Sequence, residues 1–303
     1  MKLLKTLCEI QAPSGDEILM KSFLLNYIED SKSNWKVEPE VLYGSEFQNC
    51  IMLVFGTPKT AVFAHMDSIG FTVRYEDQLV PIGSPKVTDG CRLVGKDSSG
   101  PIKCTLSVSK DNAVSYNFTR VIDTGTSLLF KPNFRESKDF VQSCYLDNRI
   151  GIYVALKLAR EVENGILVFS CWEEHGGGSI PYLIRFVYEK YQIHQALVCD
   201  ITWVTDGIRH GKGTVISIRD KNIPRRQYLE RIISIAQGKN IDYQLEVEAT
   251  GSSDGREIQN SPYPIDWCFI GAPEDNVHTP DEKVHKNDIY TMIELYKVLL
   301  EDL

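Results

Sequence analysis

The most constraining feature of this sequence is a series of short apolar runs that each end in acidic residues or histidine. His65 and Asp67 follow the run AVFA, Glu173 and Glu174 follow LVFSCW, and Asp200 follows ALVC. Such runs predict short buried β-strands. In an open α/β sheet, ligands bind in the crevice beyond the carboxyl ends of the strands. The sequence therefore predicts one polar site built where several strands end.

Helical patterns lie between these runs. Residues 148–162, 179–191 and 287–303 each carry apolar side chains on one helical face. Ser14, with Glu17 three residues later, has the pattern of a capping box at the start of another helix. Strands that alternate with helices predict an α/β fold, a doubly wound mixed sheet with helices on both faces.

The middle of the chain follows a different pattern. From residue 73 to 141 no convincing helix appears, the segment KCTLSVS alternates strictly, and turn signals recur. These features predict a small all-β insertion at 73–141. The remaining segments, 1–72 and 142–303, are then expected to form one split α/β catalytic domain.

Charge and cysteine usage exclude several functional classes. A net charge of −8 disfavours nucleic acid and anionic membranes as partners. No apolar run approaches the roughly 20 residues that span a bilayer, and the start lacks a signal-peptide pattern. The eight cysteines form no C-x-x-C pair, and we expect them to be buried thiols. We therefore expect a cytoplasmic location.

The polar residues at the strand ends suit a metal centre. His278 in EDNVHTP and Asp147 in CYLDNR extend the set to two imidazoles and several carboxylates. Burying this much charge without a counterion is costly. Mixed nitrogen and oxygen ligands suit two divalent ions, zinc or else cobalt or manganese. Two such ions can lower the pKa of a water towards 7 and polarise a carbonyl.

A carboxylate that binds no metal is then needed as general base. Glu173 and Glu174 suit this division of roles, because neighbours in an extended chain point in opposite directions. Singly, each residue has an ordinary alternative role; Asp147, for example, would be a common helix cap. Together they occupy strand ends and helix starts too consistently for that interpretation.

The motifs AHMDSIGF, LDNRIG, WEEHGGG, CDIT and VHTP occur in an order that resembles the tetrahedral, glutamyl/leucyl-type metallo-aminopeptidases. The resemblance covers nearly the whole chain, and the insertion is similar to that family's PDZ-like oligomerisation domain. It implies a zinc-peptidase-like fold, small peptide substrates, release of the N-terminal residue, and assembly into a homo-oligomer through the insertion. The sequence departs from the family at Asn148, where a second Asp is usual.

The resemblance also implies a role for each site residue. Glu173 would be the general base, and Asp67 would orient a metal-bound histidine. Asp147 would bridge the two ions. The remaining ligands implied by the resemblance would be His65, Glu174, Asp200 and His278.

Other hydrolases remain as alternatives. HGGG at 175–178 and GSSDG at 251–255 match an α/β serine hydrolase with Ser253 as nucleophile. Pro262 follows too soon for the long helix that a nucleophile elbow requires, and two carboxylates directly before an oxyanion hole would repel its negative charge.

A related metallo-carboxypeptidase or deacylase would keep the metals but cleave another bond. A degenerate member that binds peptides without cleaving them is disfavoured by the full ligand set.

Overall fold

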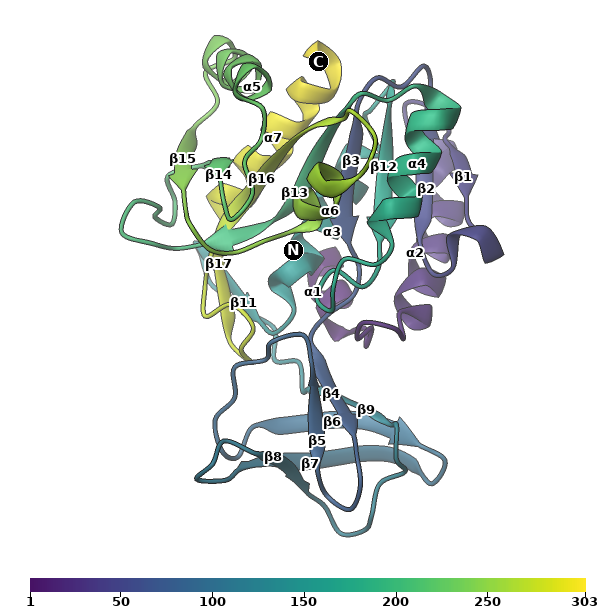
Figure 1. Cartoon of the computed structure of the whole chain (residues 1–303), viewed down its shortest axis with the longest axis vertical. Helices are drawn as coiled ribbons and strands as arrows, with labels where there is room; N and C mark the ends of the chain where they lie inside the picture. The colour runs from purple at the N-terminus through teal and green to yellow at the C-terminus, as the bar shows by residue number, and fades with distance from the viewer.

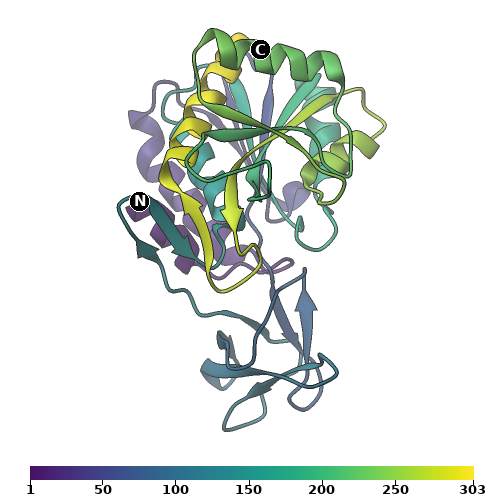
Figure 2. The same cartoon turned by 90° about the vertical axis from the view of Figure 1, so that its left-hand side faces the viewer.

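The computed structural model describes all 303 residues and arranges them in two bodies, one above the other in Figure 1. The larger body is an eleven-stranded sheet with helices on both faces, and the smaller body is a six-stranded sheet. Figure 2 shows the helices to either side of the larger sheet. The predicted α/β class with a mixed sheet is confirmed. None of the helices is both long and apolar enough to span a bilayer.

The larger sheet is built mainly from buried apolar strands. Its first strands in the chain are β1 (Glu40–Leu42), β2 (Ile51–Phe55) and β3 (Ala61–His65). Its later strands are β10 (Arg135–Glu136), β11 (Phe140–Ser143), β12 (Gly165–Ser170), β13 (Gln195–Trp203), β14 (Thr214–Arg219), β15 (Tyr243–Val247), β16 (Asp266–Asp275) and β17 (Glu282–His285). The order is β1-β2-β12-β3-β13-β16-β17-β11-β10, and β14 and β15 join beside β16.

The four central strands, β12, β3, β13 and β16, run parallel. Every residue of β3 and β12 is buried, which is why both read as continuous apolar runs. Ser170 pairs with His65, so these two strands end at the same level. Parallel strands expose their carboxyl ends at one edge, and this edge receives the polar residues that follow them.

Seven α-helices cover the larger sheet. They are α1 (Lys2–Glu9), α2 (Ile18–Ser31), α3 (Leu146–Leu158), α4 (Ile180–Tyr191), α5 (Arg226–Gly238), α6 (Asp254–Asn260) and α7 (Lys286–Asp302). Helix α3 packs against β3 and β13 and between α1 and α7, and all of its residues except Lys157 are buried. Because α3 is held on all sides, the residues at its start have fixed positions.

The smaller sheet contains β4 (Gly70–Val73), β5 (Leu79–Ile82), β6 (Arg92–Asp97), β7 (Gly100–Val108), β8 (Val114–Asn117) and β9 (Ser127–Phe130). All of its pairs are antiparallel, in the order β5-β4-β9-β6-β7-β8. Cys104 and Leu106 are buried and Thr105 is exposed, as the alternation in β7 predicts. This sheet has its own core of 15 buried residues, separate from the main core of 66.

The capping box predicted at Ser14 is wrong. Helix α2 begins at Ile18 with Glu17 at its N-cap, and the Ser14 side chain bonds to no group of that helix. Residues 14–17 form a turn in which Gly15 has φ +89° and donates its N–H to Glu17 Oε1. The Ser14 hydroxyl is therefore free to reach a distant part of the chain, as described below.

Candidate active site

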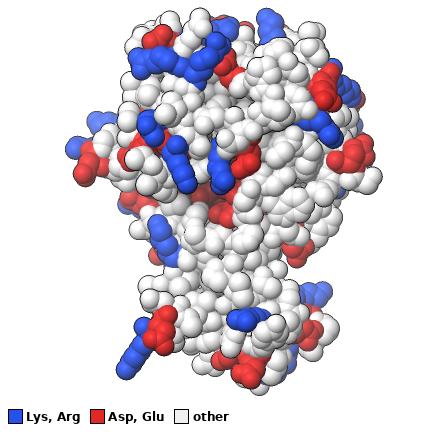
Figure 3. Space-filling model, viewed as in Figure 1, with Lys and Arg blue, Asp and Glu red and all other residues white.

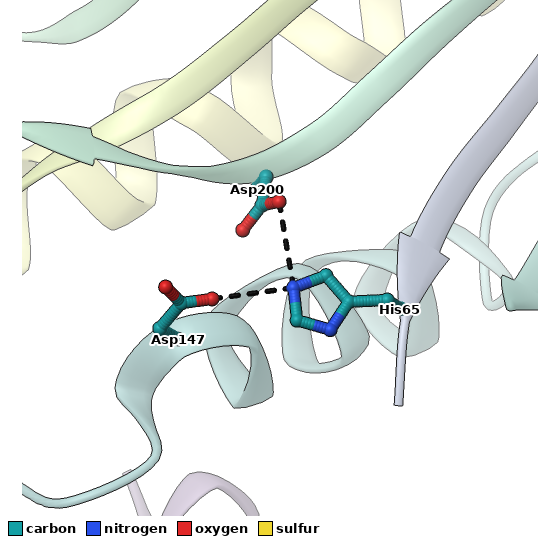
Figure 4. A group of neighbouring side chains, drawn as sticks. All are labelled: His65, Asp147 and Asp200. Atoms are coloured by element: carbon teal, nitrogen blue, oxygen red, sulfur yellow. Dashed lines mark hydrogen bonds and ion pairs between the residues drawn. The ribbon is translucent and has the colours of Figure 1, made fainter. Parts of the chain in front are cut away.

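Three predicted site residues from different elements meet at the edge of the larger sheet (Figure 4). His65 ends β3, Asp200 lies in β13, and Asp147 lies in the first turn of α3. His65 Nε2 lies 3.2 Å from Asp147 Oδ1 and 3.5 Å from Asp200 Oδ2. All three side chains are buried, and their ligand atoms lie close enough together for one ion to bind them.

A second group shares Asp147 with the first. His278 Nε2 lies 3.3 Å from Asp147 Oδ2 and 3.2 Å from Glu174 Oε2. Asp147 thus turns one carboxylate oxygen towards each imidazole. The structure places all five predicted ligands in two adjacent groups that have Asp147 in common.

Glu173 and Glu174 lie in a turn after β12, so the extended conformation expected for them is wrong. Both of their backbone N–H groups donate to the Asp67 carboxylate, each at 3.2 Å. Their side chains nevertheless reach different histidines: Glu173 Oε2 lies 3.9 Å from His65 Nε2, whereas Glu174 contacts His278. The turn, rather than strand alternation, separates the two carboxylates.

Burial sets the protonation of these carboxylates in the metal-free protein. It raises the pKa of Glu174 to about 7 and that of Asp200 to about 6, and the Asp147 charge adds to both shifts. It also raises the pKa of Glu173 well above its usual range. Burial opposes the charge on His278, but hydrogen bonds to Asp147 and Glu174 outweigh it and raise its pKa to about 11. The site holds more negative charge than its own histidines neutralise.

The donor set fits divalent cations. Glu174 Oε1 and His65 Nδ1 are buried and accept or donate no hydrogen bond, which is unusual for buried polar atoms. Each group offers imidazole nitrogen and carboxylate oxygen but no thiolate. Such ligands suit zinc and neighbouring divalent metals. A cation would satisfy the orphaned carboxylate oxygen and offset the crowded charge.

Asp67 is supported by a residue that sequence analysis assigned elsewhere. Its Oδ1 lies 3.4 Å from His65 Nδ1, and its Oδ2 accepts a 2.5 Å hydrogen bond from the Ser14 hydroxyl. Asp67 is fully buried and also receives the two amides of the 173–174 turn. It therefore holds the 173–174 turn by hydrogen bonds and lies next to the His65 imidazole. The sequence did contain Ser14 in a notable motif, but local spacing favoured a helix cap.

The smaller sheet also supplies contacts to the site. Ser84 Oγ lies 2.9 Å from His278 Nδ1, and the Lys86 N–H donates to the His278 carbonyl. The Gly83 N–H donates to Nδ1 of His175, for which the sequence suggested no clear role. The loop after β5 thus holds both histidines from the side opposite the main sheet. Nothing in the sequence near residue 84 signals this contact.

Glu282 is a further residue that sequence analysis missed. It is buried, and its two oxygens accept the backbone N–H groups of Asp147 and His278 at 3.3 and 3.1 Å. Asn148 fills a similar supporting role, because its side chain donates to the Cys199 carbonyl and accepts from the Gly151 N–H. It ties α3 to β13 immediately before Asp200.

The serine-hydrolase alternative fails on geometry. Ser253 caps α6, a helix of seven residues, and its hydroxyl accepts the Gly255 N–H. Strand β15 ends at Val247, six residues before Ser253, so no strand leads directly into it, and neither His278 nor His285 contacts it. In the HGGG loop the N–H groups of His175, Gly176 and Gly177 donate to the main-chain carbonyls of Trp172 and Glu173, and the adjacent carboxylates face His65 and His278.

Comparison with known proteins agrees with this geometry. A model of the M42 glutamyl aminopeptidase family matches residues 109–295. A putative aminopeptidase from Acetivibrio thermocellus is 25% identical, over 97% of this chain and 96% of its own length. The crystal structure of a TET aminopeptidase from a marine sediment Thaumarchaeota archaeon superposes with a TM-score of 0.87 at 20% identity, covering 100% and 97% of the two chains. The Pyrococcus horikoshii TET1 peptidase, described as assembling into a tetrahedron or an octahedral shell, gives 0.84 at 18% identity, covering 100% and 99%.

Proposed function

Since the chain belongs to the M42 glutamyl aminopeptidase family and is a metal-dependent aminopeptidase, we propose which of its residues bind the metal ions and which one transfers the proton. His65, Asp147 and Asp200 would hold one divalent ion, and Asp147, Glu174 and His278 would hold the second. The observation that supports this assignment is that Asp147 directs one oxygen to each histidine, at 3.2 and 3.3 Å.

Ions bound here would act as Lewis acids that lower the pKa of a water and polarise the scissile carbonyl. Glu173 is the general base in this proposal. Its carboxylate takes a proton at Oε2 from the attacking water and returns it to the departing amine nitrogen. Glu173 lies beside His65, faces the cavity described below and is not needed as a ligand in either group. Asp67 holds His65 and the 173–174 turn in place for this transfer.

Metal analysis and inhibition test this assignment together. We expect two transition-metal ions per chain by elemental analysis, and loss of aminoacyl hydrolysis after chelation. Peptidase activity that survives chelation but is abolished by a fluorophosphonate, or by Ser253→Ala, would contradict it.

The native metal is proposed to be zinc, with cobalt or manganese as the other ions that these ligands suit. Reconstitution of chelated protein with each ion in turn, followed by measurement of kcat/KM, tests this choice. Activity restored only by a metal outside these three would contradict it.

We also propose that the insertion, predicted over 73–141, assembles copies of this chain. The TET1 peptidase from Pyrococcus horikoshii assembles into large shells, and the insertion here exposes Tyr75, Val80 and Val121 to between 45% and 72%. Exposed apolar side chains of this size suit a protein interface. Light scattering should show an oligomer that Val121→Asp weakens.

The eight unpaired cysteines support a reducing, cytoplasmic location.

A further inference from the structure

A cavity of about 110 Å³ opens directly beside the two candidate metal groups. Asp147, Glu173, Asp200 and His278 form its catalytic wall. The opposite wall comes from Asp220, directly after β14, and from β15 and the loop that follows it, and the end of β13 also lines the cavity. Because the cavity adjoins the reacting groups and has room for one side chain, it is placed to receive the first residue of a peptide.

The wall opposite the catalytic residues is acidic. Asp220, Glu246 and Glu248 all line it, and no lysine or arginine lines any part of the cavity. Figure 3 shows acidic side chains in the hollow at the middle of this face, with basic side chains on the surface around it. Arg219 and Lys221 flank Asp220 in the chain, but neither forms an ion pair with its carboxylate, and Arg219 donates its Nε–H to the Asp220 main-chain carbonyl.

Two of these carboxylates are buried, and in each of them only one oxygen accepts hydrogen bonds from the protein. Glu246 is 4% exposed, and its Oε1 accepts a hydrogen bond from the Thr202 hydroxyl. Asp220 is 9% exposed, and its Oδ1 accepts hydrogen bonds from the backbone N–H and from the side-chain amide of Asn222. Glu246 Oε2 and Asp220 Oδ2 accept no hydrogen bond from the protein. Burial raises the pKa of both carboxyls, and for Glu246 the neighbouring charges of Glu248 and Asp220 add to the increase.

A third metal ion does not explain these acids. The two metal-binding groups of the chain both include Asp147, and neither contains Asp220, Glu246 or Glu248. Two divalent cations would balance the charges of Asp147, Glu173, Glu174 and Asp200 on the catalytic side. The three carboxylates of the far wall would still have no counterion.

The remaining lining residues suit a long aliphatic chain. Ile201, Trp203, Phe269 and Val277 provide apolar surface between the catalytic and acidic walls. A lysine side chain packs its methylene groups on such surface and places its ammonium group among polar or charged partners. An acidic first residue would meet like charge at Asp220, Glu246 and Glu248, and a leucine would leave the buried carboxylates among them unpaired.

We propose that this cavity binds the side chain of the substrate's first residue and selects a cationic one, lysine or arginine, through Asp220, Glu246 and Glu248. The preference rests on the proposed aminopeptidase function of the adjoining groups. It assigns a substrate class opposite in charge to the glutamyl residue in the family description.

The test compares lysyl, norleucyl, leucyl and glutamyl p-nitroanilides. Norleucine matches the lysine stem without its charge. We expect kcat/KM for lysyl to exceed that for norleucyl by about tenfold, equivalent to about 1.4 kcal/mol, and glutamyl to be slowest. The variant Glu246→Gln/Glu248→Gln should reduce this ratio towards one, through a larger loss of kcat/KM for lysyl than for norleucyl. Glu294→Gln, an exposed substitution on α7, should change nothing.

Other outcomes overturn the inference. A higher kcat/KM for the leucyl or glutamyl substrate than for lysyl would contradict it. An equal loss of kcat/KM for all substrates in the double variant would also contradict it, because the acids would then bind the α-ammonium group that every peptide has. Hydrolysis of none of the four would contradict the proposed function instead. In that case, calorimetric binding of lysinamide against norleucinamide to metal-loaded Glu173→Gln protein still tests the cavity: tighter binding of lysinamide supports the preference, and equal binding refutes it.

Discussion

The Ser14 hydroxyl donates a 2.5 Å hydrogen bond to Asp67 Oδ2, and so links the turn before α2 to the carboxylate that faces His65. Ser14→Ala removes this donor and leaves the fully buried Asp67 with fewer partners. Loss of groups that support metal-binding histidines typically costs 10–100-fold in metal affinity or activity. We expect a drop of about tenfold in affinity for one ion, measured by competition with a chelating dye. Ser14→Thr, which keeps a hydroxyl, should retain most of the affinity; equal losses in both variants would contradict this role.

Glu173→Gln should separate proton transfer from metal binding. The amide cannot accept the proton of the attacking water, and general-base catalysis contributes about 10²–10⁴-fold. We expect kcat to fall within that range while elemental analysis still finds two ions per chain. Glu174→Gln is the matched control, since the same change at a proposed ligand should lower metal content. Turnover near the normal value in Glu173→Gln would exclude it as the base.

Ser84→Ala should weaken one ion more than the other. Ser84 contacts Nδ1 of His278 but has no contact with His65, so only the His278 group loses support. We expect stepwise metal titration to show one site weakened about tenfold and the other unchanged. Uniform weakening of both sites would mean that the substitution disturbs the loop as a whole.

Metal binding should stabilise the fold. An ion that binds only the native state contributes about 2.7 kcal/mol at a hundred times its dissociation constant. Returning zinc to chelated protein should therefore raise Tm in scanning calorimetry. His278→Ala should retain part of this increase, because the His65 group remains. His194→Ala, an exposed histidine away from the site, should retain all of it; a reduced increase there would argue against a specific site.

Asp288 anchors the turn at residues 210–213. Its oxygens accept the N–H groups of Gly211 and Gly213 at 2.7 and 2.9 Å, and its side chain is buried in α7. Asp288→Ala leaves two donors without partners, at about 1–3 kcal/mol each. We expect the free energy of unfolding, from urea denaturation, to fall by about 2–6 kcal/mol. Asp288→Asn keeps one acceptor and should lose less; equal losses would show that the hydrogen bonds are not the cause.

Much of this protein follows from patterns local in the sequence. Buried parallel strands such as β3 and β12 require continuous apolar side chains, and β7, with one face packed on a core, requires alternation. These periodicities predicted the α/β class and the β-rich middle. Because parallel strands end at one edge, the residues after them also predicted a polar site that contains His65, Glu174 and Asp200.

Only the tertiary structure decided how these residues are supported. Ser14 has the spacing of a helix cap, yet its hydroxyl bonds to Asp67, and Glu173 and Glu174 separate through a turn instead of strand alternation. Ser84 and Glu282 reach His278 from a different sheet and a different strand. Such contacts depend on distances between segments far apart in the chain. Sequence periodicity reports which face of an element is buried, but it carries no information about which distant side chain lies opposite.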